Sequence, residues 1–345
     1  MDRELENVEN LFFETYQLDT TEITKNYRTD LRTDPPDGFQ IVENTNWRAL
    51  KWPQIGRPYG IHNYSGLKRE WEIKNGMDMP EIVQWRFHNR NMHELFHSDL
   101  SQVRKVTRKQ FHKKLIRFKF KEADDSLQKM IRLKLWYNIH HKEDAIWDPR
   151  GKRASFEGLG VNRPRILALG AGDGFDAMIL SALYPGSEAV LVDFDDFCLT
   201  DRFGRFPEEY PFLARNPKTG YWNVFNKSDF KIRYEVKDIH DLAYGKEFDI
   251  VLSSGLIEHY PDKYKPLAFH LHHQFLKPNG FAIITSTRNN LKMRTFYHLI
   301  GELLNYSYRE LMDENQLALY TFENGFKIIK ACCTKAHNCV VTQKR

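Results

Sequence analysis

A glycine-rich turn after a short apolar run is the first stretch of this sequence that can do chemistry. It reads Arg165-Ile-Leu-Ala-Leu-Gly-Ala-Gly-Asp-Gly-Phe-Asp176. Glycines at alternating positions let the backbone approach a bound group closely. A phosphate-binding P-loop is excluded because no Gly-Lys-Ser/Thr follows. A dinucleotide site is disfavoured because the motif Gly-x-Gly-x-x-Gly/Ala requires a small residue at the position that Phe175 occupies here. The turn therefore indicates another adenosine derivative.

Polar residues with matching chemistry follow the next apolar runs. Asp193 ends the second run, nineteen residues after Gly174, and an acid there can accept hydrogen bonds from both hydroxyls of a ribose. Asp238 follows the third run, where its carboxylate could accept a hydrogen bond from the exocyclic amine of adenine. The fourth run ends in Leu252-Ser-Ser-Gly-Leu-Ile-Glu-His259. Since open α/β sheets bind ligands at the carboxyl ends of their strands, these residues predict one site.

The elements that must position this site alternate between strand-like and helical patterns. Near-continuous apolar strands separated by helices predict a doubly wound α/β fold with a mostly parallel, seven-stranded sheet. The last two runs lie too close together for a helical crossover, so we expect them to be antiparallel. The predicted strands are Ile166–Leu169, Ala189–Val192, Ile232–Val236, Phe248–Leu252, Phe281–Thr285, Phe326–Cys332 and Asn338–Thr342, and helices are expected at Ala177–Tyr184 and Tyr264–Leu276.

The N-terminal part is predicted to be largely helical. Leu5, Val8, Leu11, Phe12 and Tyr16 give an amphipathic opening helix, and residues 20–60 are irregular. Further helices are expected at Pro80–His97, Val103–Phe118 and Ser126–Ile139. We therefore expect a helical cap or substrate region at 1–150 and a sheet domain at 151–345, with the boundary near Trp147-Asp-Pro-Arg-Gly-Lys152.

Residues from about 160 to 342 resemble the class I S-adenosylmethionine-dependent methyltransferases, most closely the broad type 11 group. The motifs that carry the resemblance are Leu169-Gly-Ala-Gly-Asp-Gly174, Asp193, Asp238-Ile239, Phe248-Asp-Ile-Val-Leu252 with Leu256-Ile-Glu-His259, Leu276-Lys-Pro-Asn-Gly-Phe281 and Asn324-Gly-Phe-Lys-Ile-Ile329. The resemblance implies a Rossmann-like fold, S-adenosylmethionine as methyl donor and S-adenosylhomocysteine as product.

The resemblance also implies which residues hold the cofactor. The glycine loop passes its methionine portion, Asp193 binds the ribose, Asp238 and Ile239 flank the adenine, and Phe194 packs against the adenine ring. The expected cofactor-binding residues are Gly170, Ala171, Gly172, Asp173, Gly174, Asp193, Phe194, Asp238, Ile239 and Ser254. The chain departs from the family at Ala168, where an acid often contacts the cofactor's amino group. Asp173 or the N-terminal part is expected to compensate.

An insertion at about 197–228 is a second departure, because 44 residues separate Asp193 from Asp238. It holds eight aromatic residues between Phe197 and Phe225 and the turn Asn216-Pro-Lys-Thr-Gly220. An insertion at the ligand edge can form a lid or substrate wall. It can equally be a packed structural excursion, and the sequence does not separate the two.

Methyl transfer depends mainly on holding nucleophile, methyl and sulfur in line. An oxygen nucleophile also needs a base, for which we predict His259, oriented by Glu258; the alternative is that His259 caps the helix beginning near Pro261. The aromatic N-terminal part favours a small-molecule O or N acceptor. The alternatives are an RNA methyltransferase of the tRNA type, and a non-catalytic binding protein, which Ala168 favours. The RNA alternative rests on a basic run without acids: Arg104, Lys105, Arg108, Lys109, Lys113, Lys114, Arg117, Lys119 and Lys121.

His93-Glu-Leu-Phe-His97 matches the His-Glu-x-x-His pattern of zinc proteases. No sequence signature supports a third zinc ligand, and Glu122 is a candidate only by its distance along the chain. The residues that flank His93 and His97 are polar. We therefore expect no metal site. His88, His93 and His97 are expected to form a polar helix face.

Composition limits the remaining classes. The chain has 345 residues, a net charge of +5 and 14% aromatic residues, which suits a folded protein. No membrane span is expected because no apolar run is long enough. The acidic N-terminus is unlike a secretory signal, and the four cysteines have no metal or disulfide spacing, so a cytoplasmic protein is expected.

Overall fold

The computed structural model describes residues 33–42, 46–97, 100–139, 148–216 and 218–345. Their contacts divide the chain into two units that are each discontinuous in sequence. We call them the helical unit, which includes His62–Asp144 and Arg294–Ser307, and the sheet unit, which includes Tyr27–Ile61, Ala145–Met293 and Tyr308–Arg345. One crossing between the units falls close to the boundary predicted near residue 150. Residues 27–61 precede that boundary but belong to the sheet unit, and residues 294–307 follow it but belong to the helical unit.

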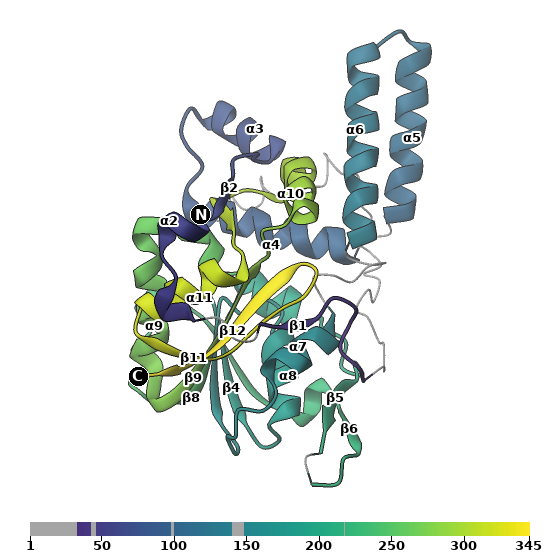
Figure 1. The fold of residues 1–345 in the computed structure, drawn as a ribbon. Helices are drawn as coiled ribbons and strands as arrows, with labels where there is room; N and C mark the ends of the chain where they lie inside the picture. The colour runs from purple at the N-terminus through teal and green to yellow at the C-terminus, as the bar shows by residue number, and fades with distance from the viewer. Residues whose placement is uncertain (1–32, 43–45, 98–99, 140–147, 217) are drawn as a thin grey trace. The chain divides into compact units, whose positions relative to one another are not determined.

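The sheet unit contains an eight-stranded sheet in the order β1-β11-β12-β9-β8-β3-β4-β7 (Figure 1). Neighbours among β9, β8, β3, β4 and β7 are parallel, whereas β12 is antiparallel to both β9 and β11. The strands are β1 (Gln40–Ile41), β3 (Arg165–Leu169), β4 (Glu188–Asp193), β7 (Lys231–Val236), β8 (Phe248–Ser254), β9 (Leu276–Thr287), β11 (Phe326–Cys333) and β12 (His337–Lys344). The predicted doubly wound fold and the antiparallel final pair are confirmed.

Strand β3 starts at the centre of the sheet. The chain builds outward through β4 and β7, then returns to the other side of β3 with β8. The order therefore reverses between β3 and β8, which is where open α/β sheets bind ligands. All seven predicted strands are present. The eighth, β1, comes from a segment predicted to be irregular and pairs with β11.

Both faces of the sheet are buried, which explains the near-continuous apolar strands. Side chains of β3 alternate between two core clusters: Ile166 and Ala168 join one, and Leu167 and Leu169 the other. Helices α7 (Pro149–Phe156) and α8 (Phe175–Leu183) contribute to the first cluster, and α9 (Lys265–Phe275) and α11 (Glu314–Glu323) to the second. The predicted boundary at 147–152 is thus partly the start of α7, whose N-cap is Asp148.

Several local features differ from the predictions. Strand β9 begins at Leu276, five residues before the predicted Phe281, so the motif Leu276–Phe281 lies inside it; Asn279 there has a positive φ of 61°, and the register with β8 shifts. The region predicted to be irregular also contains α2 (Trp52–Ile55) and β2 (Tyr59–Ile61). Strand β2 pairs with β10 (Arg309–Leu311) in a separate small sheet, so its partner lies 250 residues away along the chain.

The insertion after β4 packs into the core through its first half. Its π-helical turn Cys198–Phe203 leads to the hairpin β5 (Phe212–Arg215) and β6 (Trp222–Phe225). Phe206, Tyr210 and Phe212 are buried, and their ring centroids lie 5.6–6.0 Å from that of Phe175 on α8. This part is a packed excursion; the hairpin end at Tyr221 is exposed. Phe175 therefore anchors the insertion.

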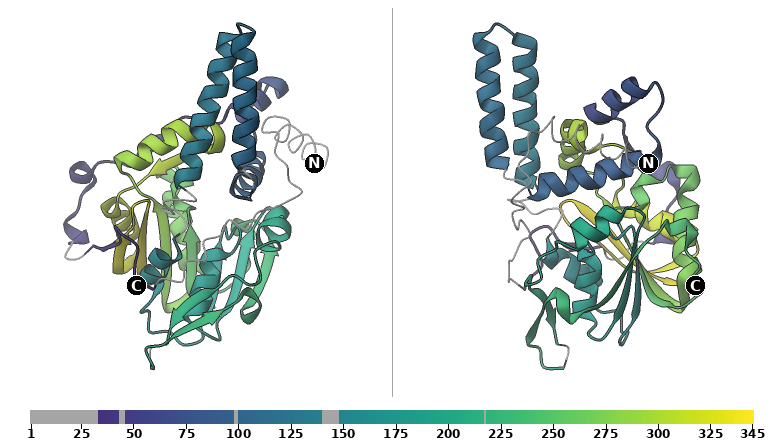
Figure 2. Two further views of the ribbon diagram at one scale, coloured as in Figure 1. Left: turned by 90° about the vertical axis from the view of Figure 1, so that its right-hand side faces the viewer. Right: turned by 180° about the vertical axis from the view of Figure 1, so that it is seen from behind.

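The helical unit contains α3 (Gly66–Asn75), α4 (Glu81–His97), α5 (Leu100–Ile116) and α6 (Phe120–Tyr137). Helix α10 (Leu291–Leu304) begins in the sheet unit and ends in this one. The side-chain amide of Asn91 on α4 donates to the carbonyl of Leu303 on α10. Helices α5 and α6 form an antiparallel hairpin (Figures 1 and 2). The three predicted helices are confirmed, with α6 starting six residues earlier; the opening helix lies outside the described residues.

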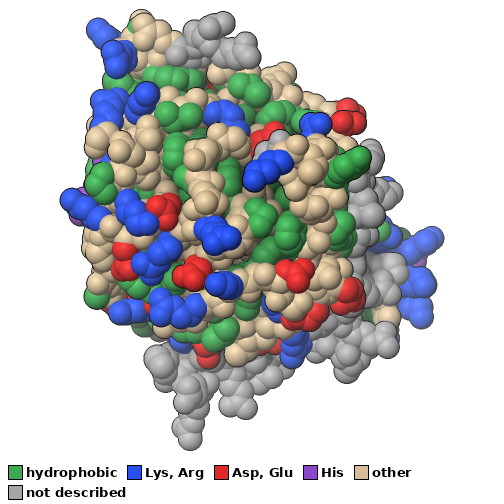
Figure 3. Space-filling view, turned by 90° about the horizontal axis from the view of Figure 1, so that it is seen from below, with side chains coloured by type: hydrophobic (Ala, Val, Ile, Leu, Met, Phe, Trp, Pro, Cys, Tyr) green, Lys and Arg blue, Asp and Glu red, His purple; other side chains and the backbone are tan. Residues whose placement is uncertain are grey.

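Acidic and basic side chains are interspersed on the face of the molecule drawn in Figure 3. The four cysteines are buried free thiols, and Cys332 pairs in register with Cys339 across β11 and β12, a proximity that their spacing did not suggest. Among the helices that the structure describes, none is long and apolar enough to cross a membrane.

Candidate cofactor site at the carboxyl edge of the sheet

The glycine loop connects β3 to α8 through three left-handed residues. Gly170, Gly172 and Gly174 have φ values of 64°, 56° and 74°, a region that glycine adopts without steric cost. The Gly174 amide donates to the Ala171 carbonyl (2.8 Å), and the Ala171 amide to the Val192 carbonyl of β4 (2.9 Å). A Cβ on Gly174 would lie 2.6 Å from Leu191 Cδ1. The alternation of glycines is thus a requirement of this backbone.

Asp193, at the end of β4, touches this loop directly. Its Oδ2 accepts the amide of Gly172 (3.1 Å) and its Oδ1 accepts that of Asp195 (3.3 Å). Burial raises the pKa of Asp193 above its ordinary value, and the guanidinium of Arg202 offsets part of that rise. A carboxylate has about four acceptor positions, and those two amides are the hydrogen bonds recorded for it within the described residues. Capacity for two further donors remains.

Arg202 and Tyr234 complete the surroundings of the loop, and the sequence analysis named neither. Nitrogen Nη2 of Arg202 lies 2.9 Å from where a Cβ on Gly172 would stand, so its guanidinium covers that glycine. The hydroxyl of Tyr234, on β7, donates to the Gly172 carbonyl (2.8 Å). Arg202 comes from the insertion and Tyr234 from mid-strand, so neither occupies a strand end where the sequence would have drawn attention to it.

The other predicted cofactor residues lie at the same edge with different exposures. Asp238 follows β7 and is exposed; its Oδ1 accepts the amide of His240 (2.8 Å). Ile239 and Phe194 are half-buried. Asp173 is buried and accepts the amide of Phe175 at the start of α8 (3.1 Å), so it stabilises that helix start.

Ser254, at the end of β8, binds a carboxylate that the sequence analysis passed over. Its Oγ donates to Oδ2 of Asp176, in the first turn of α8, and Oδ1 of Asp176 accepts from Nζ of Lys152. Lys152 also lies over the Phe175 ring, 5.1 Å from its centroid. Asp176 is 9% exposed. It links the helix after the glycine loop to the end of β8, across the point where the strand order reverses.

His259 lies in a 3-10 turn (Ile257–His259) beyond β8. Its Nδ1 lies 2.7 Å from the carbonyl oxygen of Tyr308. A carbonyl only accepts, so Nδ1 carries the hydrogen and, in the neutral ring, Nε2 carries the lone pair. His259 is half-buried. The backbone of Tyr308 thus fixes both the tautomer and the orientation of the ring.

Glu258 does not orient His259, which corrects the role predicted for it. Its Oε1 accepts from Thr287 Oγ1 (3.0 Å) and from Nη1 of Arg309 (3.2 Å). Glu258 is 1% exposed; burial raises its pKa, and Arg309 offsets part of that rise. Side chains of neighbouring residues in a tight turn point apart, and here Glu258 faces the core.

Strand β10 anchors the whole segment that carries His259. Tyr308, just before the strand, holds the imidazole; Arg309 pairs with Glu258; and Glu310 pairs with Lys265, which is fully buried at the start of α9. Buried ionic groups are tolerated only when paired. Three consecutive residues therefore fix the turn between β8 and α9, a role that nothing in their sequence signalled.

The His-Glu-x-x-His match is only partly described. His93 is buried on α4, whereas the side chain of His97 lies outside the described residues. The expected polar helix face is therefore only partly visible: Nδ1 of His88 lies 3.3 Å from the Leu304 carbonyl, so that ring donates to the backbone of α10.

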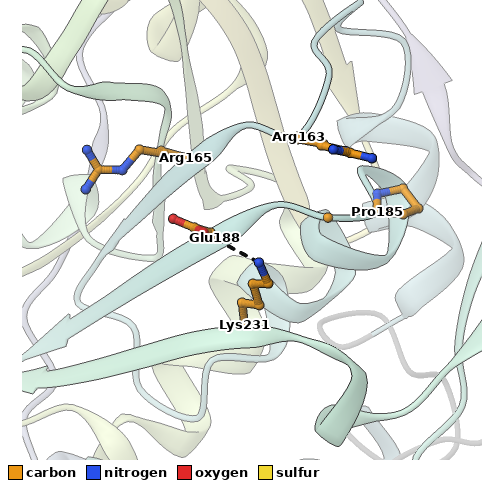
Figure 4. Close-up of a pocket in the computed structure, with 6 residues that line it drawn as sticks. Arg163, Arg165, Pro185, Glu188 and Lys231 are labelled. Atoms are coloured by element: carbon orange, nitrogen blue, oxygen red, sulfur yellow. Dashed lines mark ion pairs between the residues drawn. The ribbon is translucent and has the colours of Figure 1, made fainter.

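A pocket of about 580 Å³ lies at the opposite, amino edge of the sheet (Figure 4). It is lined by Arg163, Arg165, Pro185, Gly186, Glu188 and Lys231, and Lys231 points toward Glu188, 3.7 Å away. These residues precede or begin β3, β4 and β7. The pocket is thus at the wrong end of the strands for the predicted cofactor site.

No family's sequence model matches the chain, and no curated protein matches it. Solved structures of methyltransferases are similar to it at low identity. 1,6-Didemethyltoxoflavin-N1-methyltransferase of Burkholderia thailandensis, with S-adenosylhomocysteine bound, is 15% identical over 62% of this chain and 87% of its own, with a TM-score of 0.40. Human N-acetylserotonin methyltransferase, in complex with S-adenosylmethionine, is 15% identical over 64% of this chain and 55% of its own (TM-score 0.41).

A third similar structure is an S-adenosylmethionine-dependent methyltransferase of Mesorhizobium loti. It is 16% identical over 56% of this chain and 97% of its own, with a TM-score of 0.39. Likenesses this distant do not transfer an activity, and fold alone does not fix function. We therefore infer function from the residues at the carboxyl edge of the sheet.

Proposed function

We propose that this protein transfers a methyl group from S-adenosylmethionine to an oxygen or nitrogen of a small-molecule acceptor. The observation that carries the proposal is the contact between Asp193 and the amide of Gly172. It joins the glycine loop that follows β3 to a buried carboxylate with spare acceptor capacity at the end of the neighbouring strand β4. A nucleoside that lies along the loop would find its ribose acceptor there.

The cofactor would be held by residues at the carboxyl ends of three adjacent strands, β3, β4 and β7. Gly170, Gly172 and Gly174 let backbone approach its methionine portion, Asp193 accepts the ribose hydroxyls, and Asp238 with Ile239 and Phe194 surrounds the adenine. When bound, the cofactor supplies an electrophilic methyl on a sulfonium. The protein's own task is to position the acceptor in line with it and to exclude water.

Asp176 is our candidate for contact with the cofactor's amino group, in place of the acid missing at Ala168. Ala168 lies on the face of the sheet covered by α8, which carries Asp176 in its first turn, and Asp176 accepts a hydrogen bond from Ser254 at the end of β8. Lys152 already pairs with this carboxylate, so the site accommodates a cationic nitrogen beside Asp176. S-adenosylhomocysteine carries the amino group and methylthioadenosine lacks it. Asp176→Asn should therefore weaken the binding of S-adenosylhomocysteine about tenfold and leave the binding of methylthioadenosine unchanged. Equal effects on both affinities would refute this role.

His259 is proposed as the general base for a hydroxyl acceptor. The contact with Tyr308 leaves the Nε2 lone pair as the proton-accepting position. His259→Gln should lower kcat by about 100-fold or more and remove the acidic limb of the pH–rate profile, while S-adenosylhomocysteine affinity stays the same. A residue that only caps the following helix would change stability and leave the pH profile intact.

Calorimetric titration with S-adenosylhomocysteine, with NAD as the comparison ligand, tests the cofactor assignment. We expect a Kd near 1 μM, about −8 kcal/mol, and no heat with NAD. Binding without turnover across a broad panel of small acceptors would favour the non-catalytic alternative. Turnover of tRNA with a strongly salt-dependent KM would favour the RNA alternative.

A further inference from the structure

The tip of the hairpin formed by α5 and α6 exposes apolar side chains close together. Leu115 is 43% exposed, Ile116 78%, Phe118 80% and Phe120 65%. They lie within six consecutive positions: Leu115 and Ile116 end α5, Phe118 lies in the three-residue connection, and Phe120 begins α6. Single exposed apolar residues are common on folded proteins, whereas a contiguous group marks an interaction surface.

The backbone at the tip holds Phe118 in an unfavourable conformation. Its φ is 57°, its amide donates to the Leu115 carbonyl (3.0 Å), and the Lys119 amide donates to the Lys114 carbonyl (2.9 Å). Helices commonly end with such a left-handed residue, and glycine usually occupies the position because a side chain strains it. The ring of Phe118 meets only the edge of Phe120 among the aromatic contacts of the described residues, at 6.1 Å. Intramolecular packing does not explain a phenylalanine here.

Basic side chains surround this apolar tip. No acid occurs between 101 and 121. Lys119 pairs with Glu122 (2.7 Å), and Nζ of Lys114 turns inward to Ser126 (3.2 Å). Lys113, Arg117 and Lys121 are exposed, and no ion pair is recorded for them within the described part of the chain.

We propose that this tip, residues 113–121, docks onto the surface of an anionic phospholipid bilayer. The four apolar side chains would enter the boundary between headgroups and acyl chains, and the surrounding cations would pair with anionic headgroups. The proposal does not depend on the methyl-transfer activity. It is compatible with the absence of a membrane-spanning helix from the described residues, because this mode of binding needs none.

Nucleic acid is the other anionic partner that a basic surface can bind, and the tip fits it less well. Leu115 and Ile116 have no π-face on which a base could stack. The rings of Phe118 and Phe120 meet edge to face, at 74°, and form no flat platform. The tip is also the convex end of two helices (Figures 1 and 2), whereas single strands are bound along grooves.

Co-sedimentation of the full chain with phosphatidylcholine vesicles, with and without phosphatidylserine, tests the proposal. We expect binding only when phosphatidylserine is present. Phe118→Gly should weaken it about tenfold, since a buried aromatic side chain is lost from the contact. This variant also relieves the left-handed strain, so its melting temperature should be unchanged or higher. Loss of binding then cannot be attributed to unfolding.

Two further variants separate the apolar and electrostatic parts of the contact. Arg117→Gln with Lys121→Gln should remove the preference for phosphatidylserine. The matched control is Ile73→Ser on α3, where an apolar side chain that is 82% exposed lies outside the hairpin; it should bind like the wild type. Wild-type binding by Phe118→Gly, or no sedimentation of the wild type with phosphatidylserine vesicles, overturns the proposal. Binding of tRNA in place of vesicles, lost in the Gln variants, would assign the surface to nucleic acid.

Discussion

Replacement of Asp193 by asparagine should move stability and cofactor affinity in opposite directions. The pKa of this carboxyl is raised above 3.8, chiefly by burial, even after the attraction of Arg202. Ionised Asp193 therefore costs folding free energy: the cost is absent below pH 3.8 and present once pH exceeds the folded pKa. Asparagine is neutral and still offers an oxygen to the Gly172 amide. We expect Asp193→Asn to unfold at the wild-type temperature or above it at pH 7.

The same substitution, Asp193→Asn, should weaken the binding of S-adenosylhomocysteine. A hydrogen bond to a charged group contributes about 1.5–3 kcal/mol and one between neutral groups about 0.5–1.5 kcal/mol. Over two ribose hydroxyls the loss is about 2–3 kcal/mol, which raises Kd roughly 30- to 150-fold. Calorimetry at neutral pH measures it. Wild-type binding should also weaken as pH falls through the raised pKa of Asp193.

Asp193→Ala is the companion variant. It leaves the Gly172 amide without its side-chain acceptor, which costs about 1–3 kcal/mol of stability, and it should lose affinity at least as severely as asparagine. A parallel fall of melting temperature and affinity in Asp193→Asn would refute the reasoning, because Asp193 would then serve the loop's structure alone. Unchanged affinity would refute the ribose role.

Three further predictions concern stability, each measured by urea or thermal unfolding. Burial between α5 and α6, with a smaller effect of Lys114, lowers the pKa of Lys129 from 10.5 to about 8. The charge of Lys129 therefore destabilises the fold below pH 8, and the free energy of unfolding should rise between pH 8 and 10.5. Lys129→Met should increase the free energy of unfolding by up to about 3 kcal/mol at pH 7. Arg309→Met leaves Glu258 buried and unpaired and should cost about 3–5 kcal/mol, most of it recovered when Glu258→Leu is added; an additive double variant would contradict the pairing. Gly174→Ala combines a left-handed φ of 74° with a Cβ 2.6 Å from a side-chain carbon of Leu191 and should cost at least about 2 kcal/mol, whereas a loss under about 0.5 kcal/mol would show that the loop relaxes.

The insertion after β4 shows where sequence reasoning stopped. Eight aromatic residues in that segment were compatible with a lid or with a packed excursion, since composition does not say which way a ring points. The structure shows that the first half of the insertion packs into the core, because the rings of Phe206, Tyr210 and Phe212 surround that of Phe175. The Phe175 that argued against a dinucleotide site is the residue that receives them.

Local sequence patterns were sufficient to predict the doubly wound sheet, its seven main strands and the residues at their carboxyl ends. These follow from local patterns: buried parallel strands are continuously apolar, and turns at a ligand edge need glycines and acids at fixed distances along the chain. The partners that those residues contact depend on the three-dimensional arrangement of the chain. Tyr308 reaches His259 from 49 residues away, Arg309 reaches Glu258 from 51, and Ser254 reaches Asp176 from 78. Such pairs form because the strand order brings distant segments to one edge, and a single sequence carries no record of that proximity.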